Sequence, residues 1–387
     1  MGSAMGDGTA RAVAWLSAWD SQGTHRTGTV GDEAGADWLA REASRLGVTP
    51  ATEEFVLERF DPNDAYLEFA DARIPGVPLF DAPATTADGI SGTLGAIGSS
   101  AAIAVAELSP VSVHTADYEE VRRNAPHRGL VILCKGAHPG LGLLNAERFR
   151  QPYGAPAIQL SSEARDAVLA AAAKQAPARL VATSRRAPSR ARNVTVTISG
   201  YDPTKPPVVV MTPRSSWWQS TAERGGGLVC WLESLRALLA SSPLCNVIFT
   251  ANSGHELGHL GLDEFMTRRP GWERPIEAGV AVWVHYGANI GAVGGDLSIL
   301  STSDELRALA AAELIGAGRP ADRIAPKTLV PGGETRDIHR AGGHYVTLVG
   351  SNPLFHLPLD RWPHAVDAAA VAAIAAAAAA LVVRLTR

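Results

Sequence analysis

The sequence predicts an α/β protein with a mostly parallel sheet, helices on both faces of that sheet, and a β-rich domain inserted into the chain. In the second half of the chain, apolar strand-like runs alternate with helical patterns, as they do in parallel sheets. Between about residues 62 and 190, short strand-like pieces alternate with Gly- and Pro-rich turns instead. The chain has 387 residues, more than one hydrophobic core usually supports, so two units are expected.

The α/β domain is expected to combine residues 1–61 with residues 191–387. Hydrophobic periodicity predicts helices at residues 10–19, 32–46, 226–239, 303–315 and 368–383. It predicts strands at residues 52–57, 193–199, 207–211, 247–250, 276–284 and 345–349. The Ala-rich last helix contains few bulky apolar residues, so we expect it to pack on the sheet rather than to cross a membrane.

The inserted domain, residues 62–190, is expected to be β-rich and to contain one helix over residues 162–173. Its strand-like pieces are short and apolar, and Gly and Pro residues separate them. Its acidic and histidine side chains are scattered among turn residues and are not spaced as ligands on one helix or strand face. We therefore expect this domain to act as a lid that supplies no metal ligand and limits the size of the substrate.

Composition and charge exclude several classes of partner. The net charge is −4, with 35 basic and 39 acidic residues, which predicts neither a nucleic-acid-binding nor a membrane-binding surface. Cys134, Cys230 and Cys245 do not form a spaced set and lie in or beside apolar runs, so buried free thiols are expected. No signal peptide is visible, and together these features predict a cytoplasmic protein.

The most informative stretch runs from Asn246 to Phe265 and contains His255-Glu256-Leu257-Gly258-His259 directly after a buried strand. Open α/β sheets place their sites at such strand ends. A second interpretation is that Ser253 caps a helix and Glu256 completes a capping box, and both can hold together. In a third, zincin-type interpretation, His255 and His259 ligate zinc and Glu256 is the base. Zincins carry this motif within a helix, however, whereas here it stands at an expected helix start.

Further motifs lie along nearly the whole chain. They are residues 25–34 near the N-terminus, residues 127–133 and 154–158 in the inserted domain, residues 246–261, and Phe355-His356-Leu357-Pro358-Leu359-Asp360. Together these segments resemble metallopeptidase family 28, which includes two-zinc aminopeptidases and single-zinc glutaminyl cyclases. The inserted domain is similar to the protease-associated domain of many members. The last motif matches the family's late ligand motif, His-x-Pro-x-Asp.

The chain departs from the family at most of its ligand positions. The place of the first ligand, in a His-x-Asp motif, reads Pro213-Arg214-Ser215. Glu223 takes the position of the bridging Asp, and His285 takes that of a later Asp ligand. The paired glutamates of the family, a general base followed by a ligand, are His255 and Glu256 here.

The resemblance implies one bound Zn²⁺, or another divalent metal, held by Glu223, Glu256 and His356. Two carboxylates and one imidazole leave a fourth position for water or substrate, as in catalytic zinc sites. His285 is a further candidate ligand, but it can equally hold substrate or end its strand. The alternative is a degraded site without metal. In the base position, His255 is expected to take a proton from water, for which an imidazole is suited near neutral pH.

Five other side chains are candidate members of the site. Trp217 and Trp218 follow the lost motif and can either wall a pocket or belong to the core. Arg214 can bind a carboxylate or remain solvated. Glu334 matches an acidic position of the family that steadies a ligand or binds an amine, with a solvated loop acid as the alternative. Asp360, in the late motif, is expected to hold the ligands in position without binding the metal itself.

These residues predict a metal-dependent hydrolase of an amide or amide-like C–N bond in a small amino-acyl compound or specialised metabolite. The metal would polarise the carbonyl group and lower the pKa of its water. Loss of one metal position argues against a general aminopeptidase. The alternatives are a cyclase or acyl transferase of glutaminyl cyclase type, and a pseudoenzyme that binds a small ligand or a protein.

Overall fold

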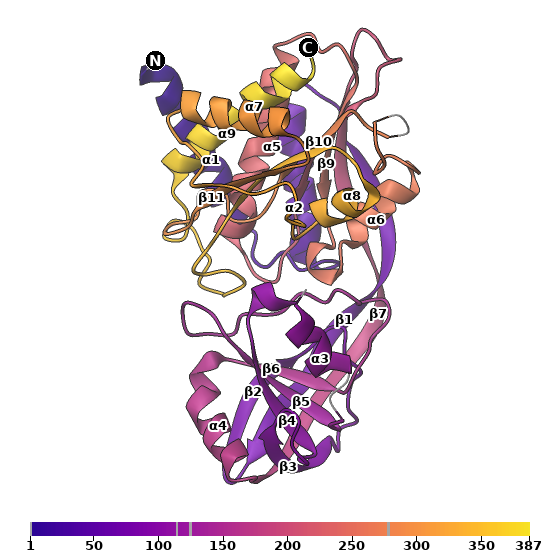
Figure 1. Cartoon of the computed structure of the whole chain (residues 1–387), viewed down its shortest axis with the longest axis vertical. Coiled ribbons are helices and arrows are strands. Elements are labelled where there is room, and N and C mark those ends of the chain that lie inside the picture. Colours follow the sequence, from indigo (N-terminus) through magenta and orange to yellow (C-terminus); the bar gives the residue numbers. More distant parts are fainter. Residues whose placement is uncertain (1, 114, 124–125, 277–278) are drawn as a thin grey trace.

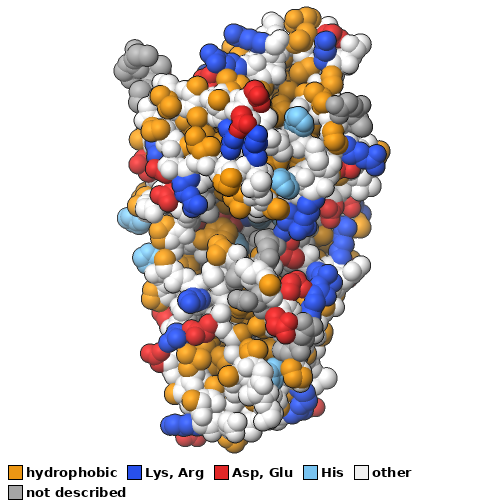
Figure 2. All heavy atoms as spheres, in the orientation of Figure 1, with side chains coloured by type: hydrophobic (Ala, Val, Ile, Leu, Met, Phe, Trp, Pro, Cys, Tyr) orange, Lys and Arg blue, Asp and Glu red, His pale blue; other side chains and the backbone are white. Residues whose placement is uncertain are grey.

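The computed structural model describes residues 2–113, 115–123, 126–276 and 279–387, and these form two lobes joined by long strands (Figure 1). Both chain termini lie on the upper lobe in this view. On the face drawn in Figure 2, basic and acidic side chains are interspersed over both lobes.

The described helices, including 3₁₀ and π turns labelled η, are α1 (Gly2–Asp20), α2 (Val30–Arg45), η1 (Pro110–Ser112), α3 (Ala116–Arg123), η2 (Ser162–Ala164), α4 (Arg165–Ala173), η3 (Thr221–Gly225), α5 (Gly226–Leu239), η4 (His255–Leu257), α6 (Leu260–Thr267), α7 (Asp304–Gly316), α8 (Thr335–Ala341) and α9 (Ala368–Leu385). The described strands are β1 (Ala51–Phe69), β2 (Ala72–Pro78), β3 (Ile90–Ala96), β4 (Ile103–Leu108), β5 (Gly129–Cys134), β6 (Ala157–Leu160), β7 (Pro177–Ile198), β8 (Val208–Pro213), β9 (Val247–Asn252), β10 (Val282–Tyr286), β11 (Leu297–Ser301), β12 (Arg323–Ile324) and β13 (Tyr345–Gly350).

The upper lobe is built on a mixed sheet with the strand order β7-β9-β8-β10-β13-β11-β12. The central strands β9, β8, β10 and β13 run parallel to one another, whereas β7 and β11 join them in antiparallel pairings. This arrangement confirms the predicted α/β class with a mostly parallel central sheet.

Alternate side chains of the central strands enter two cores on opposite faces of the sheet. In β8, Val208 and Val210 face a core shared with α1, α2, α5, α7 and α9. Val209 and Met211 face a second core shared with α6 and α8. Helices therefore cover both faces, as strands that are apolar throughout require. The apolar helix α9 is long enough to span a membrane by length and composition, and it lies against α1, α5 and α7 in the first core.

The lower lobe hangs on the two longest strands, β1 and β7, which pair along almost their whole length. Within the lobe, the pairing order β1-β2-β6-β5-β4-β3-β7 closes into a ring because β7 pairs again with β1. The predicted domain boundaries at residues 61–62 and 190–191 both fall inside these strands. The short strands expected at residues 52–57 and 193–199 are thus parts of the longer, continuous strands β1 and β7.

Most predicted elements of the upper lobe are present, and the helix predicted at residues 226–239 coincides with α5. The strand expected from Ile276 begins only at Val282, and residues 277 and 278 of that expectation lie outside the described part. The three cysteines are buried free thiols, as predicted. The main difference concerns the conformation of the stretch after β9, which is described with the site.

Candidate functional site

The parallel strands β8, β9 and β10 end at one edge of the sheet, and the predicted site residues follow them. Arg214 and Ser215 come directly after β8, and the His255–His259 stretch follows β9. His285 is the penultimate residue of β10 and is buried. Polar groups from distant parts of the sequence therefore meet where open α/β sheets bind their ligands.

The stretch after β9 is a tight turn rather than the start of a helix. A single 3₁₀ turn covers His255–Leu257, and Gly254, Gly258 and His259 all have positive φ angles, of 84°, 78° and 64°. The helix α6 begins only at Leu260. His255 and His259 have ring centroids 5.1 Å apart, but they do not share a face of one helix as the zincin interpretation requires. The expected helix start at Ser253 is therefore wrong.

Glu256 is directed into a buried hydrogen-bond network. One carboxylate oxygen accepts hydrogen bonds from the backbone N–H and the hydroxyl of Thr27, both at 2.7 Å. The other accepts from the Ser215 hydroxyl at 2.6 Å. Ser253, which was expected to cap a helix with Glu256, instead donates its hydroxyl to Asp32. The capping box is therefore not formed, and Glu256 joins the N-terminal loop to the end of β8.

Glu223 and Arg224 lie on the π turn η3, directly before α5, in a backbone held by Asp360. The Asp360 carboxylate accepts hydrogen bonds from the backbone N–H groups of Ala222 and Glu223, at 2.7 and 3.0 Å. Burial raises the pKa of Asp360 to about 7. This contact gives Asp360 the supporting position that the late motif predicts, behind Glu223. Single π turns of this kind are frequent at functional sites.

A carboxylate, an imidazole and a guanidinium meet at Glu223. Its Oε1 lies 2.6 Å from Arg224 Nη2 and 3.3 Å from His356 Nε2. His356 Nδ1 contacts the carbonyl oxygen of Leu143 at 2.5 Å, which leaves Nε2 directed at the carboxylate. Burial alone would raise the pKa of Glu223, but the charges of Arg224 and His356 lower it to about 2. Glu223 is thus a buried carboxylate whose counter-charge is supplied by the chain itself.

His255 and Glu334 form a second buried pair beside this cluster. His255 Nδ1 lies 4.0 Å from Glu334 Oε1, and the Asn252 amide approaches the other Glu334 oxygen at 3.5 Å. Burial lowers the pKa of His255 well below its ordinary value, and Arg224 and His259 add to this effect. Burial raises the pKa of Glu334 to about 7. The buried imidazole is therefore neutral near neutral pH.

His285 has one ring nitrogen held by helix α8 and the other without a partner among the described residues, and its side chain lines a cavity. Its Nδ1 shares a hydrogen bond of 2.5 Å with the Thr335 hydroxyl. Burial lowers its pKa to about 3, with smaller contributions from His259 and Arg224. In the described part of the chain, its Nε2 has no hydrogen-bond partner.

Unpaired polar atoms are concentrated at this site. Among the described residues, the buried atoms there without a hydrogen-bond partner are both carboxylate oxygens of Glu223, both terminal nitrogens of Arg224, His255 Nδ1, His285 Nε2, Glu334 Oε1, His356 Nε2 and Asn289 Oδ1. Strained backbone is concentrated here too, because Ser220, His259, Asn289 and His356 all have positive φ angles. Buried polar atoms are normally paired, so this concentration marks a place prepared for a ligand or for catalysis.

A cavity of about 380 Å³ opens beside these residues. His255, His259, His285 and Asn289 line it from the upper lobe, and Asn145 is among the residues that line it from the lower lobe. This volume is at the small end of the range that ligand pockets occupy. The cavity is therefore bounded by both lobes and suits a small molecule.

The lower lobe is held against the site by the segment 143–147. Besides the Leu143 contact with His356, the backbone N–H of Ala146 donates to the carbonyl oxygen of Glu256 at 2.8 Å. The Trp217 indole donates to Asn145 at 3.1 Å, and the Trp218 indole donates to the carbonyl oxygen of His356 at 2.8 Å. Neither indole is among the side chains that line the cavity. Trp217, expected to wall a pocket or to belong to the core, thus joins the two lobes, and Trp218 holds the loop that carries His356.

Arg214 is completely buried and does not reach the cavity. Its guanidinium forms an ion pair of 2.9 Å with Asp32 and donates to the carbonyl oxygen of Arg192 at 2.8 Å. This arginine therefore ties the end of β8 to α2 and β7, and it takes neither the solvated nor the substrate-binding position that its sequence context suggested.

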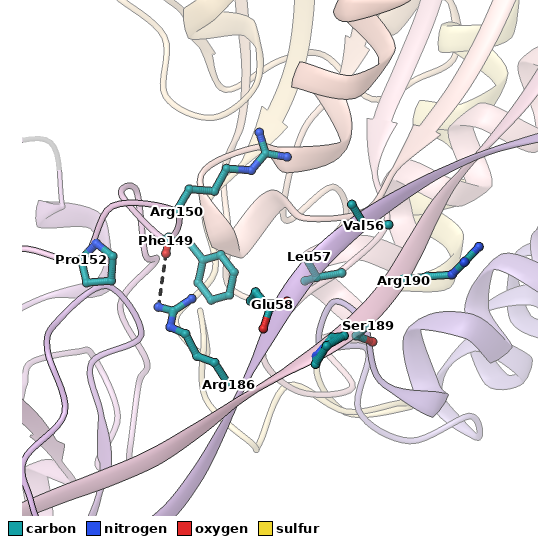
Figure 3. A pocket seen from close by; sticks show the side chains of 10 residues that line it. Val56, Leu57, Glu58, Phe149, Arg150, Pro152, Arg186, Ser189 and Arg190 are labelled. Atoms are coloured by element: carbon teal, nitrogen blue, oxygen red, sulfur yellow. Dashed lines mark hydrogen bonds between the residues drawn. The ribbon is translucent and has the colours of Figure 1, made fainter.

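A larger cavity, of about 910 Å³, lies elsewhere, along the β1–β7 ribbon between the lobes (Figure 3). Its labelled side chains include Phe149, Arg150 and Arg186, and the Arg186 guanidinium donates to the carbonyl oxygen of Phe149 at 3.3 Å. None of the predicted site residues is among those that line it. The smaller cavity beside the histidines is therefore the candidate site.

Comparison with known proteins supports the fold of this chain. No family model matches the sequence, and no curated protein does. Solved structures do match: BSAP, a zinc aminopeptidase from Bacillus subtilis, has a TM-score of 0.75 at 16% identity, with 96% of this chain and 94% of that chain covered. The chain has the zinc aminopeptidase fold.

Two further structures agree. The aminopeptidase from Aneurinibacillus sp. strain AM-1 has a TM-score of 0.72 at 14% identity, over 98% of this chain and 94% of that one. A peptidase M28 precursor from Shewanella amazonensis SB2B has a TM-score of 0.76 at 16% identity, over 100% and 96%. The TM-scores establish the shared fold, and at identities this low the activity has to be argued from the site.

The described side chains do not fit a zinc ion held by the predicted ligands. Of Glu223, Glu256 and His356, only the first and last are in contact, and both oxygens of Glu256 already accept hydrogen bonds. In the described part of the chain, no group of three or more histidine, cysteine, aspartate or glutamate side chains is arranged to hold a metal ion. A guanidinium, moreover, already contacts the Glu223 oxygen nearest His356. Zinc binding by this chain thus remains a prediction from resemblance.

Sequence reasoning missed three members of the site. Arg224 follows Glu223 directly. These two charged residues stand before three glycines and an apolar helix, and this context was a signal that both charges are buried. Thr27 and Ser215 hold Glu256, but they lie 229 and 41 residues away from it in sequence. Hydroxyl residues are too common for that contact to be predicted without the fold.

Proposed function

We propose that this chain is a peptidase-like hydrolase that cleaves an amide or amide-like C–N bond in a small amino-acyl compound or related metabolite. The observation that carries the proposal is the 380 Å³ cavity at the strand ends, lined by His255, His259 and His285. It offers several imidazoles in a small cavity bounded by both lobes, on a fold shared with aminopeptidases. Such a cavity suits a compact substrate.

His255 is the group best placed to accept a proton from water. It lines the cavity, and burial keeps its imidazole neutral, so a nitrogen lone pair is available. Glu334, with Oε1 4.0 Å from His255 Nδ1, can orient the ring and stabilise its protonated form. The proton can then pass from His255 to the leaving nitrogen. His285 Nε2 and Asn289 Oδ1, unpaired in the described structure, offer hydrogen bonds to the substrate.

The lower lobe supports the preference for small substrates. Pro110 and Val111 extend the cavity wall from the lower lobe, and the 143–147 segment is hydrogen-bonded to the upper lobe. A long peptide would have to displace these contacts. We therefore infer that the inserted domain acts as a lid, and that activity falls as the substrate is lengthened.

The experiment is a turnover assay over amino-acyl amides and short peptides of increasing length, run in H₂¹⁸O. We expect one ¹⁸O atom in the acid product, a preference for the shortest substrates, and a strong loss of turnover in His255→Ala. The exposed His364 provides the matched control, because His364→Ala should leave turnover unchanged. A product that lacks ¹⁸O would instead support a cyclase or acyl transferase.

A second candidate is a ligand-binding protein without turnover. It is favoured by one observation, namely that Glu256, which stands in a ligand position of the family, is fully engaged by Thr27 and Ser215. On this alternative the same cavity binds a small molecule reversibly. A compound of the panel that raises the Tm of the protein would support this alternative, provided that no compound of the panel is converted to product.

A further inference from the structure

Arg224 is placed at the centre of the site by the local backbone. The π turn carries Glu223 and Arg224 in succession, and both side chains are fully buried. Asp360 fixes the backbone N–H of Glu223, and the Arg224 Nε donates to the carbonyl oxygen of Ser215 at 2.7 Å. The guanidinium is therefore held at both sides, by its own turn and by the end of β8.

The guanidinium contacts Glu223, the predicted ligand that lies beside His356. Its Nη2 lies 2.6 Å from Glu223 Oε1, the same oxygen that faces His356 Nε2 at 3.3 Å. Through Ser215, whose hydroxyl donates to Glu256, it also connects to the third predicted ligand. One cation thus lies against Glu223, whose Oε1 also faces His356, and is linked to Glu256 through Ser215.

Charge makes simultaneous binding of a divalent ion unfavourable. A guanidinium is a permanent cation, and two cations a few ångströms apart repel strongly in a buried, weakly polarisable environment. Glu223 already has a full counter-charge. A zinc ion would have to displace the guanidinium from Glu223, which would leave a buried arginine without its carboxylate.

We propose that the Arg224 guanidinium takes the place of the metal ion, so that the chain holds Glu223 and His356 in position without zinc. Arg224 is then a positioning residue, and the site does its work as a metal-independent one. This inference concerns the same site as the proposed function, but it does not depend on turnover. Its test measures metal binding and stability, so its failure is distinguishable from that of the hydrolase proposal.

The test is the thermal unfolding of the purified full chain with zinc and with a chelator. In Arg224→Asn, the Glu223 and His356 side chains lose their cation, and a divalent ion can enter. We expect saturating zinc to raise the Tm of this variant by about 5 °C, the scale of binding linkage for a protein of this size. The wild type should show no such shift. Arg224→Lys keeps a positive charge and should also show none.

The control is Arg269→Asn, which removes an arginine from Glu53, a partly buried carboxylate that does not line the cavity. Zinc should leave the Tm of this control unchanged. A zinc-dependent rise in the wild type that disappears in Glu223→Gln would overturn the proposal. So would an Arg224→Asn protein that folds but is indifferent to zinc. If Arg224→Asn does not fold, the wild type and Arg224→Lys decide the question. An equal zinc-dependent rise in the Tm of both proteins would overturn the proposal. No rise in the Tm of either would support it.

Discussion

Two buried arginine–carboxylate pairs, one in each lobe, show how differently the same chemistry can be used. In the lower lobe, Arg122 Nη1 donates to Asp81 at 2.9 Å and to the Tyr118 hydroxyl at 3.0 Å, and Nη2 donates to the carbonyl oxygens of Asp81 and Tyr153. In the upper lobe, Arg224 contacts Glu223, yet both of its terminal nitrogens and both carboxylate oxygens lack a proper hydrogen bond in the described structure.

The difference separates a structural pair from a site. The lower pair is closed at both terminal nitrogens of Arg122, which both have hydrogen-bond acceptors, and only its Nε lacks a partner among the described atoms. These bonds hold the loops of that lobe together. The upper pair is open, because both Arg224 terminal nitrogens and both Glu223 oxygens lack a hydrogen bond within the described residues, and Glu223 Oε1 lies beside the unpaired His356 Nε2. Open, buried polar groups cost free energy, so a fold keeps them where something else must bind or react.

The largest effect should come from opening the closed pair. Arg122→Ala leaves the Asp81 carboxylate buried without its counter-charge, and we expect a loss of about 3–5 kcal/mol in the free energy of unfolding. Urea denaturation followed by fluorescence measures this loss. A change below about 1 kcal/mol, the usual effect of an exposed ion pair, would show that the lower pair is not the structural tie described here.

The open region should respond in function rather than in stability. We expect His255→Ala to lower kcat about 10²-fold or more, which corresponds to about 2.7 kcal/mol of transition-state stabilisation. Its Tm should stay near that of the wild type, because the imidazole nitrogen toward Glu334 has no hydrogen bond to lose. Steady-state kinetics and a thermal scan on the same sample check both parts. A large fall in Tm with unchanged kcat would place His255 among the structural groups.

Ser215→Ala tests whether Glu256 belongs with the closed groups. The Ser215 hydroxyl donates to Glu256 at 2.6 Å and accepts from the backbone N–H of Gly254 at 2.7 Å. Removing it leaves a buried carboxylate with one oxygen unpaired, and we expect a loss of about 2 kcal/mol in unfolding free energy. An unchanged stability would mean that Glu256 is free to serve elsewhere, as the ligand that the family resemblance implies.

The smallest effect should follow from loosening the contact between the lobes. Gly258 has a φ of 78°, and an added Cβ would lie 2.7 Å from the carbonyl oxygen of Glu147. We expect Gly258→Ala to cost about 1–2 kcal/mol in unfolding free energy and to shift turnover toward longer substrates. Competition between a dipeptide and a longer peptide measures the shift. Gly316→Ala, at a glycine whose added Cβ would meet nothing nearby, is the control.

The sequence predicted the upper lobe well because its elements depend on local patterns. The helix α5 and the buried strands β8, β9 and β13 follow from apolar periodicity and from glycine or polar ends. The turn at His255–His259 could not be predicted in this way. Its shape depends on positive φ angles and on the close approach of Gly258 to Glu147, which belongs to the other lobe.

The sequence predicted which residues lie near one another better than it predicted how they are arranged. Glu223, His255, His285, Glu334, His356 and Asp360 all reach the same edge of the sheet. Which way a carboxylate turns is decided by its neighbours in space, and Glu256 turns to Thr27 and Ser215. Arg224 could be recognised only once its guanidinium was seen against Glu223.

The most direct test of the central claim is the zinc content of the wild-type chain, measured by elemental analysis after incubation with excess zinc and removal of the unbound ion. The described contacts predict far less than one zinc per chain, with no difference between the wild type and Glu223→Gln. One tightly bound zinc per chain in the wild type, lost in Glu223→Gln and in His356→Asn, would contradict the account and restore the metal site that the family resemblance implies.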